Sequence, residues 1–222
     1  MRNKVIDHAK RYLSEFDPAV VFDVGANIGQ SSLEFSTAYP SAHVFAFEPV
    51  SASYDELLQN VNGARNVSCH KVALSDSERE GLITSNGKST GNRLVPGQAR
   101  GKTESVRITT GDNFCREHNI EKIDLLKVDA EGADLSVLVG FTGMLRSRCF
   151  RLIQVETGLS PENNRHASLE QVCHFLFPFG YRIYGFFGLA RHLGSKVRRS
   201  GAMFCDTVFV REDLADTPVP AP

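Results

Sequence analysis

Hydrophobic and polar positions form two kinds of pattern that alternate along this chain. Short hydrophobic runs predict β-strands, and longer segments with a hydrophobic residue every three or four positions predict helices. The runs expected to form strands are 19–23, 43–47, 67–72, 123–129, 150–155, 181–187 and 203–210. The segments expected to form helices are 3–16, 29–38, 51–62, 112–119, a segment from 134, and 168–177. This alternation predicts an α/β fold with a mostly parallel sheet and helices on both faces.

The last two predicted strands are joined by a glycine-rich, basic connection in which no helix is expected. A parallel crossover usually contains a helix, whereas a loop alone returns the chain in the opposite direction. The final strand is therefore expected to run antiparallel to its neighbours.

Residues 77–111 interrupt the alternation. Short strands are expected at 81–84 and 106–109, and the glycine-rich segment between them has little to bury. A long loop in a compact domain is usually either disordered or a mobile lid. We favour a mobile lid at about 85–102, because this segment follows a strand end that should face a ligand.

The expected organisation has three parts. An N-terminal helix occupies 1–18, one domain occupies 19–212, and a flexible tail with three prolines occupies 213–222.

The composition is that of one ordinary globular domain, with 222 residues, 41% of them hydrophobic and 23% charged. A formal net charge of −1 gives no electrostatic reason to expect nucleic acid or an anionic membrane as a partner. The five cysteines are scattered without a Cys-x-x-Cys pair, which argues against a disulfide framework or a zinc cluster. No hydrophobic run approaches the length of a membrane span, and the charged N-terminus is unlike a signal segment. We therefore expect a cytoplasmic protein without membrane insertion.

The first predicted strand ends in Asp23-Val-Gly-Ala-Asn-Ile-Gly29, immediately before a helix. Glycine lets the backbone approach a ligand closely, and the free N–H groups of a helix start favour electron-rich ligand atoms. The second strand ends in Glu48, where such folds hold the two hydroxyls of a ribose. These features predict a nucleotide-type site, although glycine is common in any turn between a strand and a helix.

The glycine spacing disfavours a nicotinamide-dependent oxidoreductase. A dinucleotide fingerprint needs Gly-x-Gly-x-x-Gly so that a pyrophosphate can lie on the helix N-terminus. Here three residues separate Gly25 from Gly29, and Asp23 is expected to point into the turn. A carboxylate there would repel a pyrophosphate, but it would balance an ammonium or a sulfonium.

Carboxylates recur at the ends of the predicted parallel strands. Asp23, Glu48, Asp129 and Glu156 lie at four of these ends, and Ala73 lies at another. Because ligands of such sheets bind beyond the carboxyl ends of the strands, we expect these residues to surround one site.

Six motifs then occur in a recognisable order. They are Asp23-Val-Gly-Ala-Asn-Ile-Gly29, Phe47-Glu48-Pro49, Val72-Ala-Leu-Ser-Asp76, Leu126-Lys-Val-Asp-Ala-Glu-Gly-Ala-Asp134, Val137-Leu-Val-Gly140 and Leu152-Ile-Gln-Val-Glu156. Over about residues 19–210 the chain resembles an FkbM-type S-adenosylmethionine-dependent methyltransferase. The resemblance implies a Rossmann-like, seven-stranded class I methyltransferase sheet whose last strand is antiparallel.

The resemblance also implies how S-adenosylmethionine is bound. The turn containing Gly25 would wrap the methionine end, Glu48 would hold the ribose hydroxyls, and the turn from Ala73 to Ser75 would border the adenine. The cofactor-binding residues expected are Asp23, Gly25, Ala26, Asn27, Gly29, Glu48, Ala73 and Leu74.

Methyl transfer to an alcohol needs a base for the hydroxyl proton, or a metal that lowers the hydroxyl pKa. Asp129, Glu131 and His166 are the candidate catalytic residues. We expect Asp129 and Glu156 to bind a divalent cation such as Mg²⁺, or the substrate hydroxyls, with His166 or Glu131 as the base. His166 also fits a solvated loop histidine, and Glu131 also fits a residue that charges the following helix N-terminus.

The acceptors usual in this family are hydroxyls, often on sugars or other secondary metabolites. The expected function is therefore O-methylation of a sugar, glycolipid or glycosylated metabolite. An inactive cofactor-binding partner subunit is the main alternative, but such a subunit would not need Asp129 and Glu156. The N-terminal helix or the strand pair at 181–210 offers a surface for a homodimer.

Overall fold

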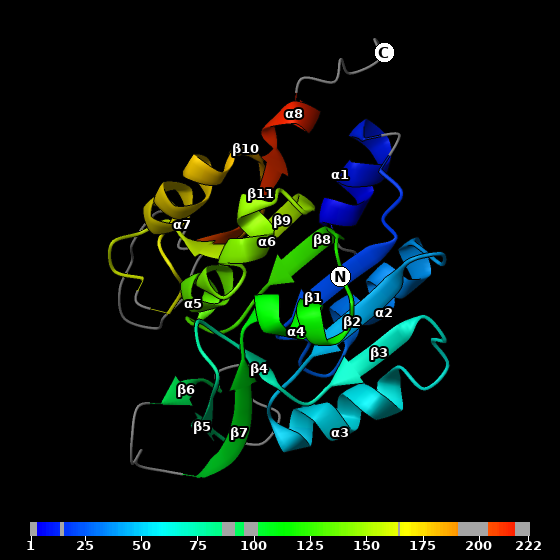
Figure 1. Ribbon diagram of the computed structural model, residues 1–222, viewed down its shortest axis with the longest axis vertical. Coiled ribbons are helices and arrows are strands. Elements are labelled where there is room, and N and C mark those ends of the chain that lie inside the picture. The colour runs from blue at the N-terminus through cyan, green and yellow to red at the C-terminus, as the bar shows by residue number, and fades with distance from the viewer. Residues whose placement is uncertain are drawn as a thin grey trace.

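The computed structural model describes residues 4–13, 16–85, 92–95, 102–163, 165–190 and 204–215. Its main element is a seven-stranded sheet with the strand order β10-β11-β9-β8-β1-β2-β3 (Figure 1). The strands are β1 (Val20–Val24), β2 (His43–Phe47), β3 (Val67–His70), β8 (Ile123–Val128), β9 (Phe150–Gly158), β10 (Tyr181–Ala190) and β11 (Phe204–Arg211).

Strand direction in this sheet follows the sequence pattern. The neighbouring pairs among β9, β8, β1, β2 and β3 are parallel. Strand β11 runs antiparallel to both β9 and β10. The predicted seven-stranded, mostly parallel sheet with an antiparallel last strand is confirmed.

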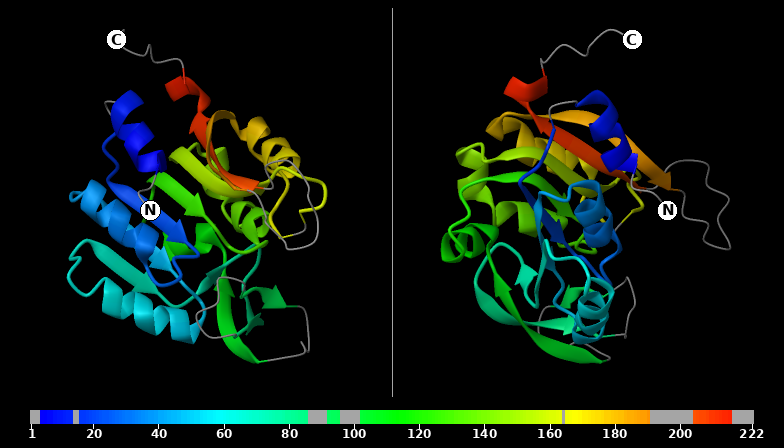
Figure 2. Two further views of the ribbon diagram at one scale, coloured as in Figure 1. Left: turned by 180° about the vertical axis from the view of Figure 1, so that it is seen from behind. Right: turned by 90° about the vertical axis from the view of Figure 1, so that its right-hand side faces the viewer.

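Helices cover both faces of the sheet, as the two views in Figure 2 show. One face packs against α1 (Lys4–Tyr12), α2 (Gln30–Ala38) and α3 (Ser51–Asn60). The other face packs against α4 (Gly111–Glu117), α5 (Asp134–Val139), α6 (Thr142–Arg146) and α7 (Leu169–Leu176). Within the described residues, no helix has the length and apolar character needed to cross a membrane.

Side chains alternate between the two faces of the sheet along each strand, and this places hydrophobic residues in two separate cores, one on each face. Successive strand residues point to opposite faces, so Val21 packs with α1 and α2 while Phe22 packs with α4 and α5. Leu125 and Leu126 of β8 are divided in the same way. Each central strand is therefore buried on both sides, which explains its nearly continuous hydrophobic sequence.

A second, smaller sheet has the strand order β4-β7-β5-β6. Its strands are β4 (Ala73–Leu74), β5 (Arg79–Thr84), β6 (Leu94–Val95) and β7 (Thr103–Thr109). The sequence predicts short strands at 81–84 and 106–109 but not their assembly with β4 and β6 into a separate sheet. The predicted lid falls mostly on 86–91 and 96–101, outside the described residues.

The small sheet is fixed to the main one by a polar contact at the start of α3. The Glu104 carboxylate accepts a hydrogen bond from the Ser51 backbone N–H at 3.1 Å and another from the Ser51 hydroxyl. This contact holds β7 beside the loop between β2 and α3, which follows Glu48.

The chain after β11 contains one more short helix. Residues 212–215 form α8 (Glu212–Ala215), where the sequence predicts the start of a flexible tail. The rest of the predicted tail lies outside the described residues.

Candidate functional site

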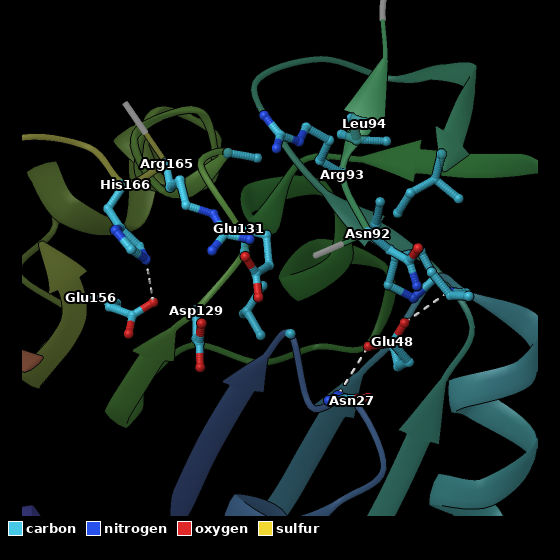
Figure 3. Close-up of a pocket in the computed structure, with 18 of the residues that line it drawn as sticks. Asn27, Glu48, Asn92, Arg93, Leu94, Asp129, Glu131, Glu156, Arg165 and His166 are labelled. Carbon is cyan, nitrogen blue, oxygen red and sulfur yellow. Dashed lines mark hydrogen bonds and ion pairs between the residues drawn. The ribbon is translucent and has the colours of Figure 1, made fainter. Parts of the chain in front are cut away.

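A cavity of about 580 Å³ lies beyond the carboxyl ends of β1, β2 and β8, with the small sheet on one side (Figure 3). Its volume is in the range of small-molecule sites. Glu48 lines one part of the cavity, and Asp129, Glu131, Glu156 and His166 line another.

The turn after β1 is fixed between two strands. The backbone N–H groups of Gly25 and Ala26 both donate to the Phe47 carbonyl, at 3.0 and 2.9 Å. Gly25 has a φ of +80°, and a Cβ there would lie 1.8 Å from the Asp129 carbonyl oxygen. Glycine at this position is therefore required for the turn to pass under the end of β8.

Gly29 serves packing rather than the cavity. It precedes α2 with a φ of +92°, and a Cβ there would lie 2.7 Å from Leu57 Cδ1. Gly29 and the buried Ala26 are not among the residues that line the cavity. Both residues were expected to bind cofactor, and the structure instead places them where α2 packs against α3.

Glu48 holds the floor of the cavity through two backbone contacts. Its carboxylate accepts hydrogen bonds from the Asn27 N–H at 2.9 Å and the Val50 N–H at 2.8 Å. Burial raises the pKa of Glu48 to about 7, although both hydrogen bonds act in the opposite direction. The side-chain oxygen of Asn27 is buried beside it without a hydrogen-bond partner among the described residues.

Glu48→Gln is expected to change how stability depends on pH. The ordinary pKa of 4.5 is raised to about 7 in the native state, so the native protein binds more protons than the unfolded chain between these values. The contribution of Glu48 to the free energy of unfolding of the wild type therefore falls as the pH rises from 4.5 to about 7. Glutamine lacks the titration, so the variant should gain about 3 kcal/mol relative to wild type between pH 4 and pH 8.

Urea unfolding at several pH values measures this difference. Glu117→Gln, which changes an exposed carboxylate in α4, is the matched control and should show no such trend. A Glu48→Gln effect that is the same at every pH would contradict the raised pKa.

Asp23 lies beneath the cavity rather than in it. The expectation that Asp23 points into the ligand-binding turn does not match its position, because its side chain is fully buried on the α2 face of the sheet. The hydroxyls of Ser31 and Ser32 each donate to Asp23 at 2.6 Å. The Lys127 Nζ lies 3.2 Å from Asp23 and 3.4 Å from Asp129.

Lys127 connects this buried carboxylate to the cavity. Burial lowers the pKa of Lys127, but the adjacent Asp23 and Asp129 outweigh burial and raise it overall. Lys127 therefore stays charged and holds Asp129 at the end of β8, with the Asp129 side chain 40% exposed.

His166 and Glu156 form a hydrogen-bonded pair in the cavity wall. His166 Nε2 lies 2.9 Å from a Glu156 oxygen, and its Nδ1 contacts the Asn163 side chain at 2.9 Å. The ring also stacks on Phe204. The hydrogen bond to Glu156 raises the pKa of His166 despite burial, and burial raises the pKa of Glu156. With its side chain 8% exposed, His166 is not the solvated loop histidine that the sequence also allowed.

Glu131 adds another carboxylate to the same wall. It has a φ of +51°, unusual for a residue with a side chain, and burial raises its pKa. Asp134, the acidic residue in the first turn of α5, accepts from N–H groups of the preceding turn, from Ala130 at 2.8 Å and from Gly132 at 3.2 Å. The start of α5 therefore already carries a carboxylate besides Glu131.

The cavity brings together most of the predicted site. The expected residues that line it are Gly25, Asn27, Glu48, Ala73, Leu74, Asp129, Glu131, Glu156 and His166. Among the described residues, no group of three or more histidine, cysteine, aspartate or glutamate side chains is arranged to hold a metal ion. In the described part of the chain, Asp129 and Glu156 thus have no third histidine, cysteine, aspartate or glutamate placed to complete the predicted metal site.

Residues that were not predicted also line the cavity, among them Asn92, Arg93, Leu94 and Arg165. These four come from the glycine-rich segment and from the polar loop after β9. Neither segment has a hydrophobic period that could have indicated its path.

Comparison with known sequences identifies the family of this chain. The model of the Methyltransferase FkbM domain matches residues 23–183, which include Glu48 of the cavity floor and the wall residues from Asp129 to His166. The chain belongs to the FkbM methyltransferase family.

Similar proteins include two methyltransferases. The chain is 31% identical over 150 residues to the hexuronic acid methyltransferase AglP of Haloferax volcanii, covering 65% of this chain and 59% of that protein. It is 29% identical over 146 residues to the 2-O-methyltransferase NoeI of Sinorhizobium fredii, covering 58% of this chain and 59% of that protein. The matches thus span about three-fifths of the length of these relatives.

Solved structures confirm the fold of this member of the FkbM family. The methyltransferase FkbM of Methylobacillus flagellatus superposes with a TM-score of 0.56 at 16% identity, over 87% of this chain and 44% of that one. The magnesium protoporphyrin IX methyltransferase of Synechocystis, solved with bound S-adenosylmethionine, gives 0.55 at 12% identity, over 94% of this chain and 76% of that one.

Proposed function

We propose that this protein is an S-adenosylmethionine-dependent O-methyltransferase that acts on a hydroxyl of a sugar, glycolipid or glycosylated metabolite. One observation carries the proposal. A single cavity joins a nucleoside-type floor at Glu48 and Asn27 to a wall of proton acceptors at Asp129, Glu131 and the Glu156–His166 pair. Membership of the FkbM family supports it, as do the names of one relative that methylates a hexuronic acid and of another that is a 2-O-methyltransferase.

The floor residues fit S-adenosylmethionine. The Glu48 carboxylate accepts hydrogen bonds in the place where this fold holds ribose hydroxyls. The buried, unpartnered oxygen of Asn27 suits an N–H donor such as the ammonium of the cofactor. Ala73 and Leu74 offer an apolar edge for the adenine. When bound, this cofactor supplies an electrophilic methyl group on a sulfonium.

The wall residues fit an alcohol acceptor. As the new C–O bond forms, the hydroxyl must lose its proton to a nearby base. Asp129 and Glu131 present carboxylates to the cavity, and Glu156 with His166 provides a second proton acceptor. Glu131 and His166 remain the two candidates for the base, while Asp129 and Glu156 orient the hydroxyl or bind a cation that does so.

Titration calorimetry with S-adenosylmethionine tests the cofactor assignment directly. We expect binding with or without Mg²⁺ and after chelation, and no binding of NADH. A mass-spectrometric screen of sugar acceptors then tests methyl transfer, and its dependence on Mg²⁺ tests the cation. Binding of NADH, or of neither ligand, would contradict the proposal, and cofactor binding without transfer to any acceptor would favour the inactive partner subunit.

A further inference from the structure

Two arginines line the mouth of an otherwise acidic cavity. Arg93 precedes β6 in the small sheet, and Arg165 lies in the loop between β9 and α7. Figure 3 shows the two side chains extending from opposite sides toward the space above Glu131. The cationic groups of the mouth thus come from two separate parts of the fold.

Neither guanidinium forms an ion pair or hydrogen bond with the residues that the structure describes. Other arginines with a carboxylate in reach do so. The pairs are Arg79–Asp76 at 3.2 Å, Arg107–Glu117 at 3.3 Å, Arg182–Glu212 at 3.1 Å and Arg211–Asp213 at 2.6 Å. Arg93 and Arg165 therefore keep their hydrogen-bond donors available to a ligand, although Glu131, Glu156 and Glu162 line the same cavity. The charge of Arg165 still acts on the Glu131 carboxyl, whose pKa it lowers against the larger effect of burial.

The backbone on both sides fixes these arginines in place. The Arg93 N–H donates to the Thr84 hydroxyl at 2.9 Å, and the Thr84 N–H donates to the Arg93 carbonyl at 3.0 Å. The Arg165 N–H donates to Asn163 at 3.0 Å. The Arg165 carbonyl lies so close to Gly132 that a Cβ there would approach it to 2.6 Å. Both side chains therefore start from hydrogen-bonded backbone in the lining of the cavity.

Acidic and basic side chains line different parts of the cavity. The floor and wall are acidic, which suits the sulfonium and ammonium of the cofactor, whereas the mouth carries two guanidinium groups. Transfer of a methyl group to a neutral hydroxyl has no use for cations beyond the acceptor. A guanidinium binds a carboxylate or phosphate through two parallel hydrogen bonds, which gives both affinity and orientation.

We infer that the acceptor carries an oxyanion, a carboxylate or a phosphate ester, which Arg93 and Arg165 bind while the acceptor hydroxyl lies at Asp129 and His166. This inference rests on the proposed methyl transfer and narrows its substrate class to acidic sugars or similar polyols. Arg93 and Arg165 are then the residues that determine acceptor specificity.

The test compares matched acceptors with saturating S-adenosylmethionine. Glucuronate against glucose isolates the carboxylate, and glucose 6-phosphate against glucose isolates the phosphate. We expect kcat/KM for one acidic acceptor to exceed that for glucose at least about tenfold, in keeping with a charged hydrogen bond. The acid that is preferred over glucose, either glucuronate or glucose 6-phosphate, shows whether a carboxylate or a phosphate is recognised.

Arg93→Gln and Arg165→Gln should each reduce this preference about tenfold, through KM rather than kcat. Arg107→Gln is the matched control, because Arg107 pairs with Glu117 on the surface and does not line the cavity. Its preference should equal that of wild type. Glucose used as well as both acids, or a preference unchanged in both cavity variants, would overturn the inference.

A binding measurement separates this inference from the proposed function. Glucuronate and glucose 6-phosphate are titrated by calorimetry into the complex with S-adenosylhomocysteine, or into the protein alone if that ligand does not bind. Weaker binding of an acid to Arg165→Gln than to Arg107→Gln supports the anion site even where no methyl transfer occurs. Absence of acid binding to wild type overturns the anion site, whether or not S-adenosylmethionine binds.

Discussion

Replacing Lys127 with methionine is expected to lower the free energy of unfolding by about 3–5 kcal/mol. Lys127 is the cation that faces the fully buried Asp23, at 3.2 Å, and it also lies 3.4 Å from Asp129. Methionine fills a similar volume but leaves Asp23 as a buried charge balanced only by two serine hydroxyls. Urea unfolding monitored by circular dichroism measures the loss.

Two further variants separate charge from packing at this position. Lys122→Met is the matched control, because Lys122 is 58% exposed and lies 3.6 Å from Asp124, so it should cost less than about 1 kcal/mol. Asp23→Asn combined with Lys127→Met removes both charges and should recover much of the loss. A Lys127→Met protein as stable as Lys122→Met would refute the role given to this ion pair.

Asp129→Asn is expected to reduce kcat for methyl transfer by about 10²–10⁴-fold. The Asp129 carboxylate stands at the end of β8, oriented by Lys127 and facing the cavity near Glu131 and Glu156. Asparagine has the same shape but lacks the negative charge that orients the acceptor hydroxyl or binds a cation beside it. Initial rates with a responsive sugar acceptor measure kcat.

Cofactor binding serves as the internal check on this variant. Asp129→Asn should bind S-adenosylmethionine as wild type does, since Glu48 and Asn27 are unchanged. Asp76→Asn, an exposed aspartate paired with Arg79 outside the cavity, should retain full turnover. Full turnover in Asp129→Asn would show that Asp129 has no part in the reaction.

The strand pattern predicted the main sheet because each central strand is buried on both faces. The predicted strand 43–47 coincides with β2, and the predicted helix 29–38 differs from α2 by one residue. Parallel strands end at one edge, so Glu48, Asp129 and Glu156 could be placed around one site without knowing any contact.

Asp23 shows where this reasoning fails. A carboxylate at a strand end was expected to face the ligand, but alternation within β1 puts Asp23 on the same face as Val21, under α2. Its partner Lys127 comes from the adjacent strand, opposite Asp23 in the register. The sequence contains both residues, but only the pairing of β1 with β8 brings them together.

The mouth of the cavity was not predictable for a different reason. The backbone of Arg93 and of Arg165 is held by hydrogen bonds to Thr84 and Asn163 rather than by a repeating hydrophobic face. The small sheet likewise depends on pairing β5 with β7 across a long connection. Local propensity indicates such strands but does not choose their partners.

The backbone of the cavity also constrains how this protein can be engineered. Four non-glycine residues of the described chain have a positive φ, and Asn27 and Glu131 are the two that line the cavity. Each such residue stores roughly 1 kcal/mol of conformational strain that glycine would relieve. Directed evolution for heat resistance alone would therefore tend to erase these two side chains, so a thermostable descendant should be selected for turnover at the same time.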